Sequence, residues 1–139
     1  MHGGTTRVMS ASEVHVPGRP TTPRGVKALA IAAALSFEHY RPGGMRVHGG
    51  SVILEPGLTA ADFAELHREG VRMAKGGFGC FADAEEYVPM VRAAREAGLV
   101  VMCHSGGGAI PGSKDKIDAD LLLRMNPNGA GHVNGGPPP

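Results

Sequence analysis

Four short apolar runs recur along the chain at a nearly constant interval, and each ends at or near a histidine or a lysine. These residues are 27, 29 and 28 positions apart, and a Gly-Gly pair follows each of them closely: His48, Lys75, His104 and His132. An interval near 30 residues is about the length of one strand-helix unit in an eightfold barrel of roughly 250 residues. The interval therefore favours a parallel sheet built from repeated strand, loop and helix units.

Helix and strand signals alternate between these runs. Strands are expected at 6–11, 45–50, 71–75, 99–103 and 130–133, and helices at 24–39, 59–70, 83–98 and 118–125. Thr59 with Asp62, and Asp83 with Glu86, have the spacing of a capping box at a helix N-terminus, while Pro89 predicts an irregular first turn. This alternation is typical of βαβ units around a parallel sheet. A Rossmann-like sheet would give a similar interval, and the residue types at the strand ends favour the barrel.

The residues at the strand ends predict a metal site. In a barrel the carboxyl ends of neighbouring strands point to one mouth, so the four side chains would share one rim. His104 and His132 would present imidazole nitrogens to one divalent ion and leave open positions, where water loses a proton near neutral pH. Lys75 belongs beside a cation only as a neutral amine or after conversion to an anion, and burial makes the neutral form accessible.

Other interpretations of these residues stay open. The two histidines could be ordinary polar residues that close strands, and Lys75 could be a solvated strand-end lysine. His48 could contact the substrate from its strand end, or it could be a structural histidine held by hydrogen bonds. The interval alone does not decide between these alternatives.

The charge and cysteine content exclude several classes of protein. Lys and Arg total 14 against 13 Asp and Glu, a formal net charge of +1, and aromatic residues make up 4%. Nucleic-acid-binding proteins need a basic surface that this composition lacks. No stretch has the roughly 20 apolar residues of a membrane span, and no signal peptide pattern is present, so a cytoplasmic location without a membrane partner is expected. Cys80 and Cys103 lack metal-site spacing and are expected to be buried.

One competing motif lies between a predicted strand and a predicted helix. Residues 77–82, GFGCFA, fit a loose dinucleotide-binding fingerprint. That fold requires an acidic residue about 20 positions further on, where this chain has Cys103 and His104. The motif is therefore set aside as a nucleotide site.

Several longer motifs resemble the enamidase group of the amidohydrolase superfamily. They extend in order over nearly the whole chain: HGGTT at 2–6, PGRP at 17–20, VHGG at 47–50, VILEPGLTAADF at 52–63, CHSGGGAIPGS at 103–113 and GHVNGGP at 131–137. The resemblance implies an α/β fold, a partial (β/α)8 TIM barrel with about strands 2 to 6. Residues 1–139 would form a single partial barrel domain with a flexible Pro-rich C-terminal end.

The activity implied by the resemblance is metal-dependent hydrolysis of C–N bonds in a small cyclic amide. The family's ligands after the fourth, fifth and sixth strands match Lys75, as a carbamate, His104 and His132. Zinc is the expected metal, with iron or manganese as alternatives. A homo-oligomer is compatible with this assignment.

The sequence also departs from the superfamily pattern. Members of the superfamily carry an HxH pair after the first strand and a metal-binding aspartate, the usual proton shuttle, after the eighth; neither has a counterpart here. The resemblance associates a glutamate with enamidase where this chain has Lys75, which argues against strict enamidase specificity. We therefore expect an incomplete enzyme as this chain. The alternatives are a noncatalytic truncated product and another TIM-barrel enzyme that acts without a metal.

Overall fold

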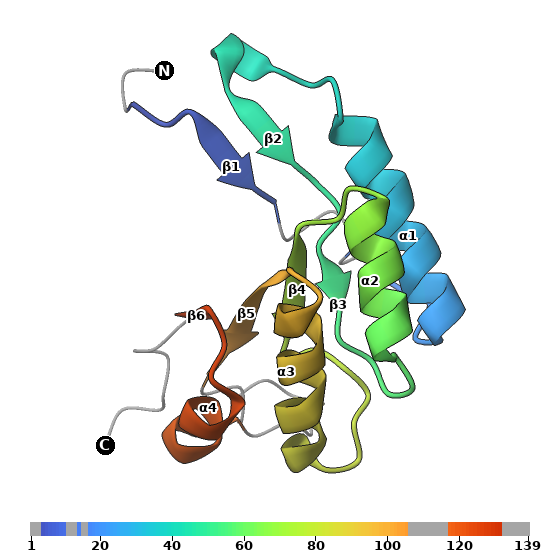
Figure 1. The fold of residues 1–139 in the computed structure, drawn as a ribbon, viewed down its shortest axis with the longest axis vertical. Coiled ribbons are helices and arrows are strands. Elements are labelled where there is room, and N and C mark those ends of the chain that lie inside the picture. The colour runs from blue at the N-terminus through green and yellow to red at the C-terminus, as the bar shows by residue number, and fades with distance from the viewer. Residues whose placement is uncertain (1–3, 11–13, 15–16, 106–116, 132–139) are drawn as a thin grey trace.

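The computed structural model describes residues 4–10, 14, 17–105 and 117–131. Its elements are β1 (Arg7–Met9), α1 (Pro23–Phe37), η1 (Pro42–Gly44), β2 (Arg46–His48), β3 (Val52–Ile53), α2 (Ala60–Arg68), β4 (Met73–Gly76), η2 (Ala84–Glu86), α3 (Tyr87–Glu96), β5 (Val100–His104), α4 (Ala119–Met125) and β6 (Gly129–Gly131) (Figure 1). The Pro-rich C-terminal end lies outside the described residues. None of the described helices is long and apolar enough to cross a membrane.

All strand pairings are parallel, and strands that pair are also neighbours along the chain. β1 pairs with β2, and β3, β4, β5 and β6 form a four-stranded sheet in that order. Only residues 49–51 separate β2 from β3, too few for a crossover between neighbouring parallel strands, so β2 leads into β3 as two parts of one interrupted strand (Figure 1). A doubly wound sheet reverses its order at a switch point, whereas each strand of a (β/α)8 barrel neighbours the next one along the chain. The observed order is that of a barrel segment.

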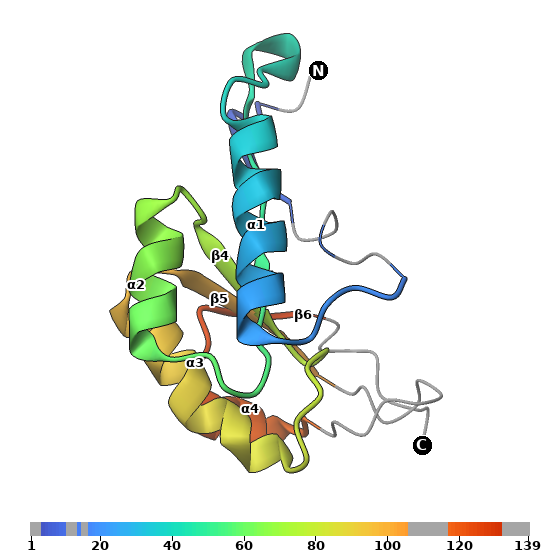
Figure 2. The same cartoon turned by 90° about the vertical axis from the view of Figure 1, so that its right-hand side faces the viewer.

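One apolar core joins the helices to a single face of the strands. It combines the strand residues Val52, Ala74 and Val101 with residues from the described helices α1, α2, α3 and α4, which gather along one side of the strands (Figures 1 and 2). The helix residues of this core are Val26, Ala30, Phe63, Leu66, Tyr87, Val91, Ala94, Leu121 and Met125. Burying one such large side chain contributes about 1.5–3 kcal/mol. Helices on one face of consecutive parallel strands are again the arrangement of a barrel wall.

Two helix starts lie where the sequence predicted them. Thr59 and Asp62 form a reciprocal capping box at α2, and Asp83 and Glu86 form one at η2. Pro89 lies in the first turn of α3, and the 3-10 turn η2 precedes that helix, so the predicted irregular start is confirmed. These caps satisfy backbone N–H groups that the start of a helix otherwise leaves unpaired.

The strand predicted at 45–50 differs from the structure in its extent. Two short strands occur in this region: β2 ends at His48, and β3 begins at Val52 after a turn. Gly50 in that turn has a φ of +82°, and a Cβ added to it would lie 2.1 Å from the Ala30 carbonyl oxygen of α1. Glycine is required because the chain bends in a left-handed conformation directly against α1. As a result β3, not β2, pairs with β4.

Candidate functional site at the carboxyl edge of the sheet

Lys75 and His104 lie on neighbouring strands at the carboxyl edge of the sheet. Lys75 of β4 is in register with Met102 of β5, and His104 follows two residues later. Because side chains alternate between the two faces of a strand, Lys75, Met102 and His104 share one face. The flanking residues Ala74 and Cys103 belong to the core under the helices. The face of Lys75 and His104 is therefore the one turned away from the helices, which is the interior face of a barrel.

Phe78 brings these two side chains into one cluster. The Lys75 Nζ lies 4.6 Å from the centroid of the Phe78 ring, and the Phe78 and His104 rings meet edge to face with their centroids 4.4 Å apart. Gly77 has a φ of +94°, and a Cβ added there would lie 3.1 Å from the His104 Cβ. The glycine lets the loop after β4 turn back so that Phe78 contacts both candidate ligands.

The environment of Lys75 favours the neutral form of its amine. Lys75 is half-buried, and desolvation by burial lowers the pKa of its amine below the usual value. Removal from water destabilises a charged ammonium group more than a neutral amine. The neutral amine is the form that acts as a nucleophile, and its reaction with carbon dioxide gives an anionic carbamate. The direction of this shift agrees with the condition that the sequence set for a lysine beside a cation.

A buried ion pair, which sequence reasoning missed, supports the loop that carries Phe78. Glu55 follows two residues after Ile53, the residue in register with Lys75, and its side chain is completely buried. The Arg19 Nη2 lies 2.6 Å from the Glu55 Oε1 and also donates a hydrogen bond to the Phe78 carbonyl oxygen. The Cys80 amide donates to the Glu55 Oε2.

The signal for this pair was weak in the sequence. Glu55 ends the apolar run VILE just before Pro56 and Gly57, and a carboxylate there is unusual for a strand end that enters a core. Its partner Arg19 stands 36 positions earlier, in the loop before α1. No local pattern connects a loop arginine with a glutamate at that separation, so the pair becomes visible only in three dimensions.

His48 does not share the edge with Lys75 and His104. It ends β2, before β3 begins, and lines a cavity of about 330 Å³ together with Gly70 and Arg72, which precede β4. The pKa of His48 is lowered by burial first and then by surrounding positive charge; the arginines responsible are Arg46, Arg7, Arg72 and Arg41. His48 therefore lies toward the amino end of the sheet, and the expectation of one rim for all four residues is wrong for it. The substrate contact predicted for His48 stays a prediction without support from this position.

The third predicted ligand, His132, lies outside the described residues. β6 ends at Gly131, which is in register with His104. In the part of the chain that the structure describes, no group of three or more His, Cys, Asp and Glu side chains is arranged to hold a metal. The described residues thus place two of the three predicted ligands, one of them a lysine, at one edge of the sheet.

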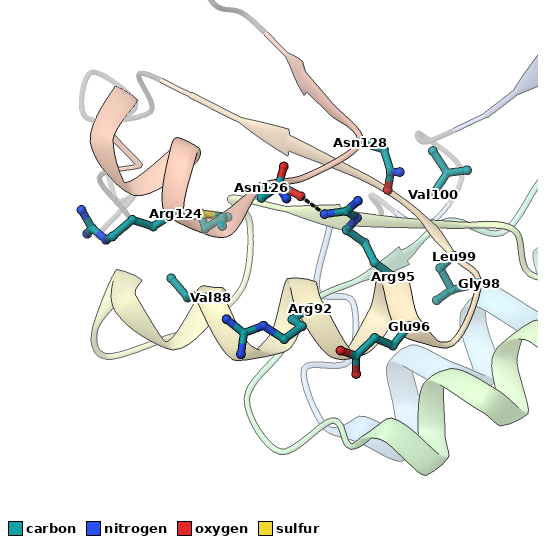
Figure 3. Close-up of a pocket in the computed structure, with 11 residues that line it drawn as sticks. Val88, Arg92, Arg95, Glu96, Gly98, Leu99, Val100, Arg124, Asn126 and Asn128 are labelled. Atoms are coloured by element: carbon teal, nitrogen blue, oxygen red, sulfur yellow. Dashed lines mark hydrogen bonds between the residues drawn. The ribbon is translucent and has the colours of Figure 1, made fainter.

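A larger cavity, of about 620 Å³, lies away from this edge (Figure 3). It is formed by α3, α4 and the residues that lead into β5 and β6, among them Arg92, Arg95, Leu99 and Asn128. Arg95 donates a hydrogen bond to the Asn126 carbonyl oxygen across this cavity. Because it opens at the amino ends of the strands, where barrel enzymes do not place their chemistry, we do not assign the candidate site to it.

The two cysteines differ in their environment. Cys103 is buried, and the prediction is confirmed for it, but Cys80 is exposed and the prediction is wrong there. Cys80 lies in the loop after β4, which runs along the edge of the sheet instead of beneath a helix. Burial raises the pKa of the Cys103 thiol to about 12.

We expect iodoacetamide at pH 8 to alkylate Cys80 and to spare Cys103 in the folded chain. The thiolate is the reactive form, and a thiol with a pKa of about 12 is ionised to only about one part in 10,000 at this pH. Peptide mass mapping measures the two rates, and labelling in guanidinium chloride provides the control in which both cysteines should react. Equal rates in the folded chain would contradict the burial of Cys103.

Both the sequence and the structure of this chain are similar to those of enamidase. No protein-family model matches the chain. The chain is 45% identical to enamidase of Eubacterium barkeri over 138 residues, which cover 99% of this chain and 36% of that protein. A crystal structure of enamidase, described as a new member of the amidohydrolase superfamily, matches with a TM-score of 0.76 and 45% identity over 91% of this chain and 33% of that chain.

This chain therefore spans about a third of the length of the proteins that it matches. Over that third it shares the fold of enamidase, so both the resemblance and the partial barrel predicted from the sequence are confirmed.

Proposed function

We propose that the chain forms part of a metal-dependent hydrolase of the amidohydrolase superfamily that cleaves a C–N bond in a small cyclic amide. The observation that carries this proposal is the placement of Lys75 and His104 on one face, at the carboxyl ends of adjacent strands. Barrel enzymes assemble their chemistry at this edge. The 45% identity to enamidase supports the reaction class.

The donor atoms of the described residues fit a divalent metal on the condition that the Lys75 amine is converted to an anionic carbamate. The imidazole of His104 is a suitable ligand for zinc, and iron or manganese would also accept it. Lys75 fits as an anionic carbamate, a form that the lowered pKa of its amine makes accessible. We propose His132 as the third ligand, because it is the first residue after β6, the strand that pairs with the strand of His104.

Bound at this edge, the metal would polarise the amide carbonyl and acidify a water molecule. The chain's own side chains would contribute in other ways. Phe78 covers Lys75 and contacts His104, so it excludes water from one side of the site and limits the rotation of both side chains. A substrate with a flat ring could pack beside Phe78 from the open side.

Metal analysis and hydrolysis, both measured on the protein purified from its full reading frame, test this proposal. We expect stoichiometric divalent metal by inductively coupled plasma mass spectrometry and hydrolysis of at least one member of a panel of small cyclic amides. A chelator should remove both, and added zinc should restore both. Bound metal without hydrolysis of any cyclic amide would reject the substrate class and keep the metal site.

Two alternatives predict other results in this experiment. A noncatalytic product would show neither metal nor hydrolysis, even after zinc is added. Another barrel enzyme would show activity that the chelator does not change. Either result would reject the proposal.

A further inference from the structure

We infer that Arg19 and Glu55 are positioning residues, which hold the segment Gly77–Cys80 so that the Phe78 ring covers Lys75 and contacts His104. The inference deepens the proposed function, since it rests on Lys75 and His104 as members of the site. Neither Arg19 nor Glu55 is assigned contact with a substrate or a metal. Their role is to fix the backbone of the loop that forms one wall of the site.

The hydrogen bonds of the segment support this role. The Phe78 carbonyl oxygen accepts from the Arg19 Nη2 at 2.7 Å, and the Cys80 amide donates to the Glu55 Oε2 at 2.7 Å. Between them, the Gly79 amide donates to the Tyr87 hydroxyl at 2.8 Å. Three consecutive residues are thus tied to three separate parts of the chain: the loop before α1, the segment just after β3, and the start of α3.

The segment needs such external support because its own sequence is permissive. Phe78 stands between two glycines, which lose more conformational entropy than other residues when they become ordered. Gly79 also approaches the body of the protein so closely that an added Cβ would lie 2.2 Å from the Leu54 carbonyl oxygen. The close approach removes any side chain that could anchor the loop at Gly79. Anchoring therefore falls to the backbone contacts with Arg19, Glu55 and Tyr87.

The chemistry of the Arg19–Glu55 pair is better suited to holding the loop than to stabilising the core. Glu55 is fully buried, and the Arg19 side chain is 14% exposed. A buried ion pair often stabilises a protein no more than apolar residues of the same volume would. Apolar side chains, however, cannot bind a carbonyl oxygen and an amide at defined points. The pair supplies one charged donor and one charged acceptor to the loop, and charged hydrogen bonds are about twice as strong as neutral ones.

Nuclear magnetic resonance of the metal-free full chain tests the inference without any need for activity. The readouts are the ring-current shift of the Lys75 ε-methylene protons and the nuclear Overhauser effect between the Phe78 and His104 rings. The Phe78→Leu variant defines the values without the ring. We expect Glu55→Gln to weaken both signals and to accelerate exchange of the Cys80 amide about tenfold, because an amide oxygen is a weaker acceptor than a carboxylate.

A double variant covers the case in which a single change unfolds the chain. Arg19→Met with Glu55→Leu fills the space without leaving a buried charge, and it removes both contacts to the loop. We expect its Lys75 shift to move to the Phe78→Leu value. The matched control is Glu65→Gln, which makes the same change in another ion pair, with Lys27, and should leave both readouts unchanged.

A folded double variant that keeps the Lys75 shift and the contact between the Phe78 and His104 rings would overturn the inference. An absence of metal or hydrolysis in the wild type would reject the proposed function instead, since neither readout depends on them. The two failures are therefore distinguishable.

Discussion

Changing Lys75 to methionine is expected to remove the divalent metal from the full protein and to lower its amide hydrolysis at least about a hundredfold. Loss of a residue that merely orients a ligand typically lowers metal affinity or activity 10-fold to 100-fold, and loss of a ligand should cost no less. Methionine keeps most of the length and the apolar contact with Phe78 but cannot become an anion. Metal content by mass spectrometry and initial rates measure the two effects.

Metal binding should depend more on the charge of the residue at position 75 than on its shape. Lys75→Glu is expected to retain more metal than Lys75→Met, because a carboxylate supplies an anionic oxygen ligand without modification. Metal loading of the wild type should fall in buffer freed of carbon dioxide, whereas that of Lys75→Glu should not respond. His39, whose side chain is 91% exposed, gives the control His39→Ala, which should load metal normally. Full metal content in Lys75→Met would contradict a ligand role for Lys75.

His104→Ala is expected to lose metal as Lys75→Met does, but the metal that it retains should still depend on carbon dioxide because Lys75 is intact, whereas metal retained by Lys75→Met should not. Comparing the two variants separates the loss of a direct imidazole ligand from the loss of the anionic residue beside it.

The placement of Lys75 and His104 at the carboxyl edge of the sheet could be predicted from the sequence because it depends on short-range order. A parallel strand is followed by a loop and a helix of limited length, so the same strand position returns at a nearly constant interval. The capping box of Thr59 and Asp62 is equally local, since its two residues are three positions apart. Such features need no knowledge of the tertiary structure.

The expectation that His48 shares the rim with Lys75 and His104 was wrong because the interval does not report where a strand bends. Glycines follow both His48 and Lys75, yet Gly50 turns the chain against α1 before β3 begins. Residues that precede β3 cannot reach the carboxyl edge. The interval of 27 residues between His48 and Lys75 therefore separates a residue of β2 from a residue of β4. These two strands are not neighbours in the sheet, because the strand that pairs with β4 is β3.

The Arg19–Glu55 pair was beyond sequence reasoning for a different reason. Long-range ion pairs depend on how a loop folds over a sheet, and charge patterns in sequence reveal pairs mainly within one helix. Cys80 was misplaced for the same reason, since its loop lies along the rim and exposes it. The parts of the site on loops were therefore those that the sequence described least well.

Replacing Glu55 alone with leucine is expected to destabilise the chain by about 3 kcal/mol. The change leaves the largely buried guanidinium of Arg19 without its partner, and breaking a buried ion pair in this way costs roughly 3–5 kcal/mol. We place the effect at the lower end because Arg19 retains some exposure to water. Urea denaturation, with stability taken from the midpoint and slope, measures the change.

The double variant Arg19→Met with Glu55→Leu should recover most of that loss, because no charge then remains buried. The four proteins form a double-mutant cycle, and because either single change leaves a buried charge without its partner, we expect a coupling energy of at least about 3 kcal/mol. The same cycle on Lys27 and Glu65, whose glutamate side chain is 41% exposed, should give at most about 1 kcal/mol. The double variant could instead be as unstable as Glu55→Leu. Apolar packing would then have failed to replace the ion pair, and the hydrogen bonds of the pair to Phe78 and Cys80 would contribute more to stability than the attraction between its charges. Recovery of stability together with loss of the Phe78 position would instead mean that the fold tolerates an apolar pair at these positions and the site does not.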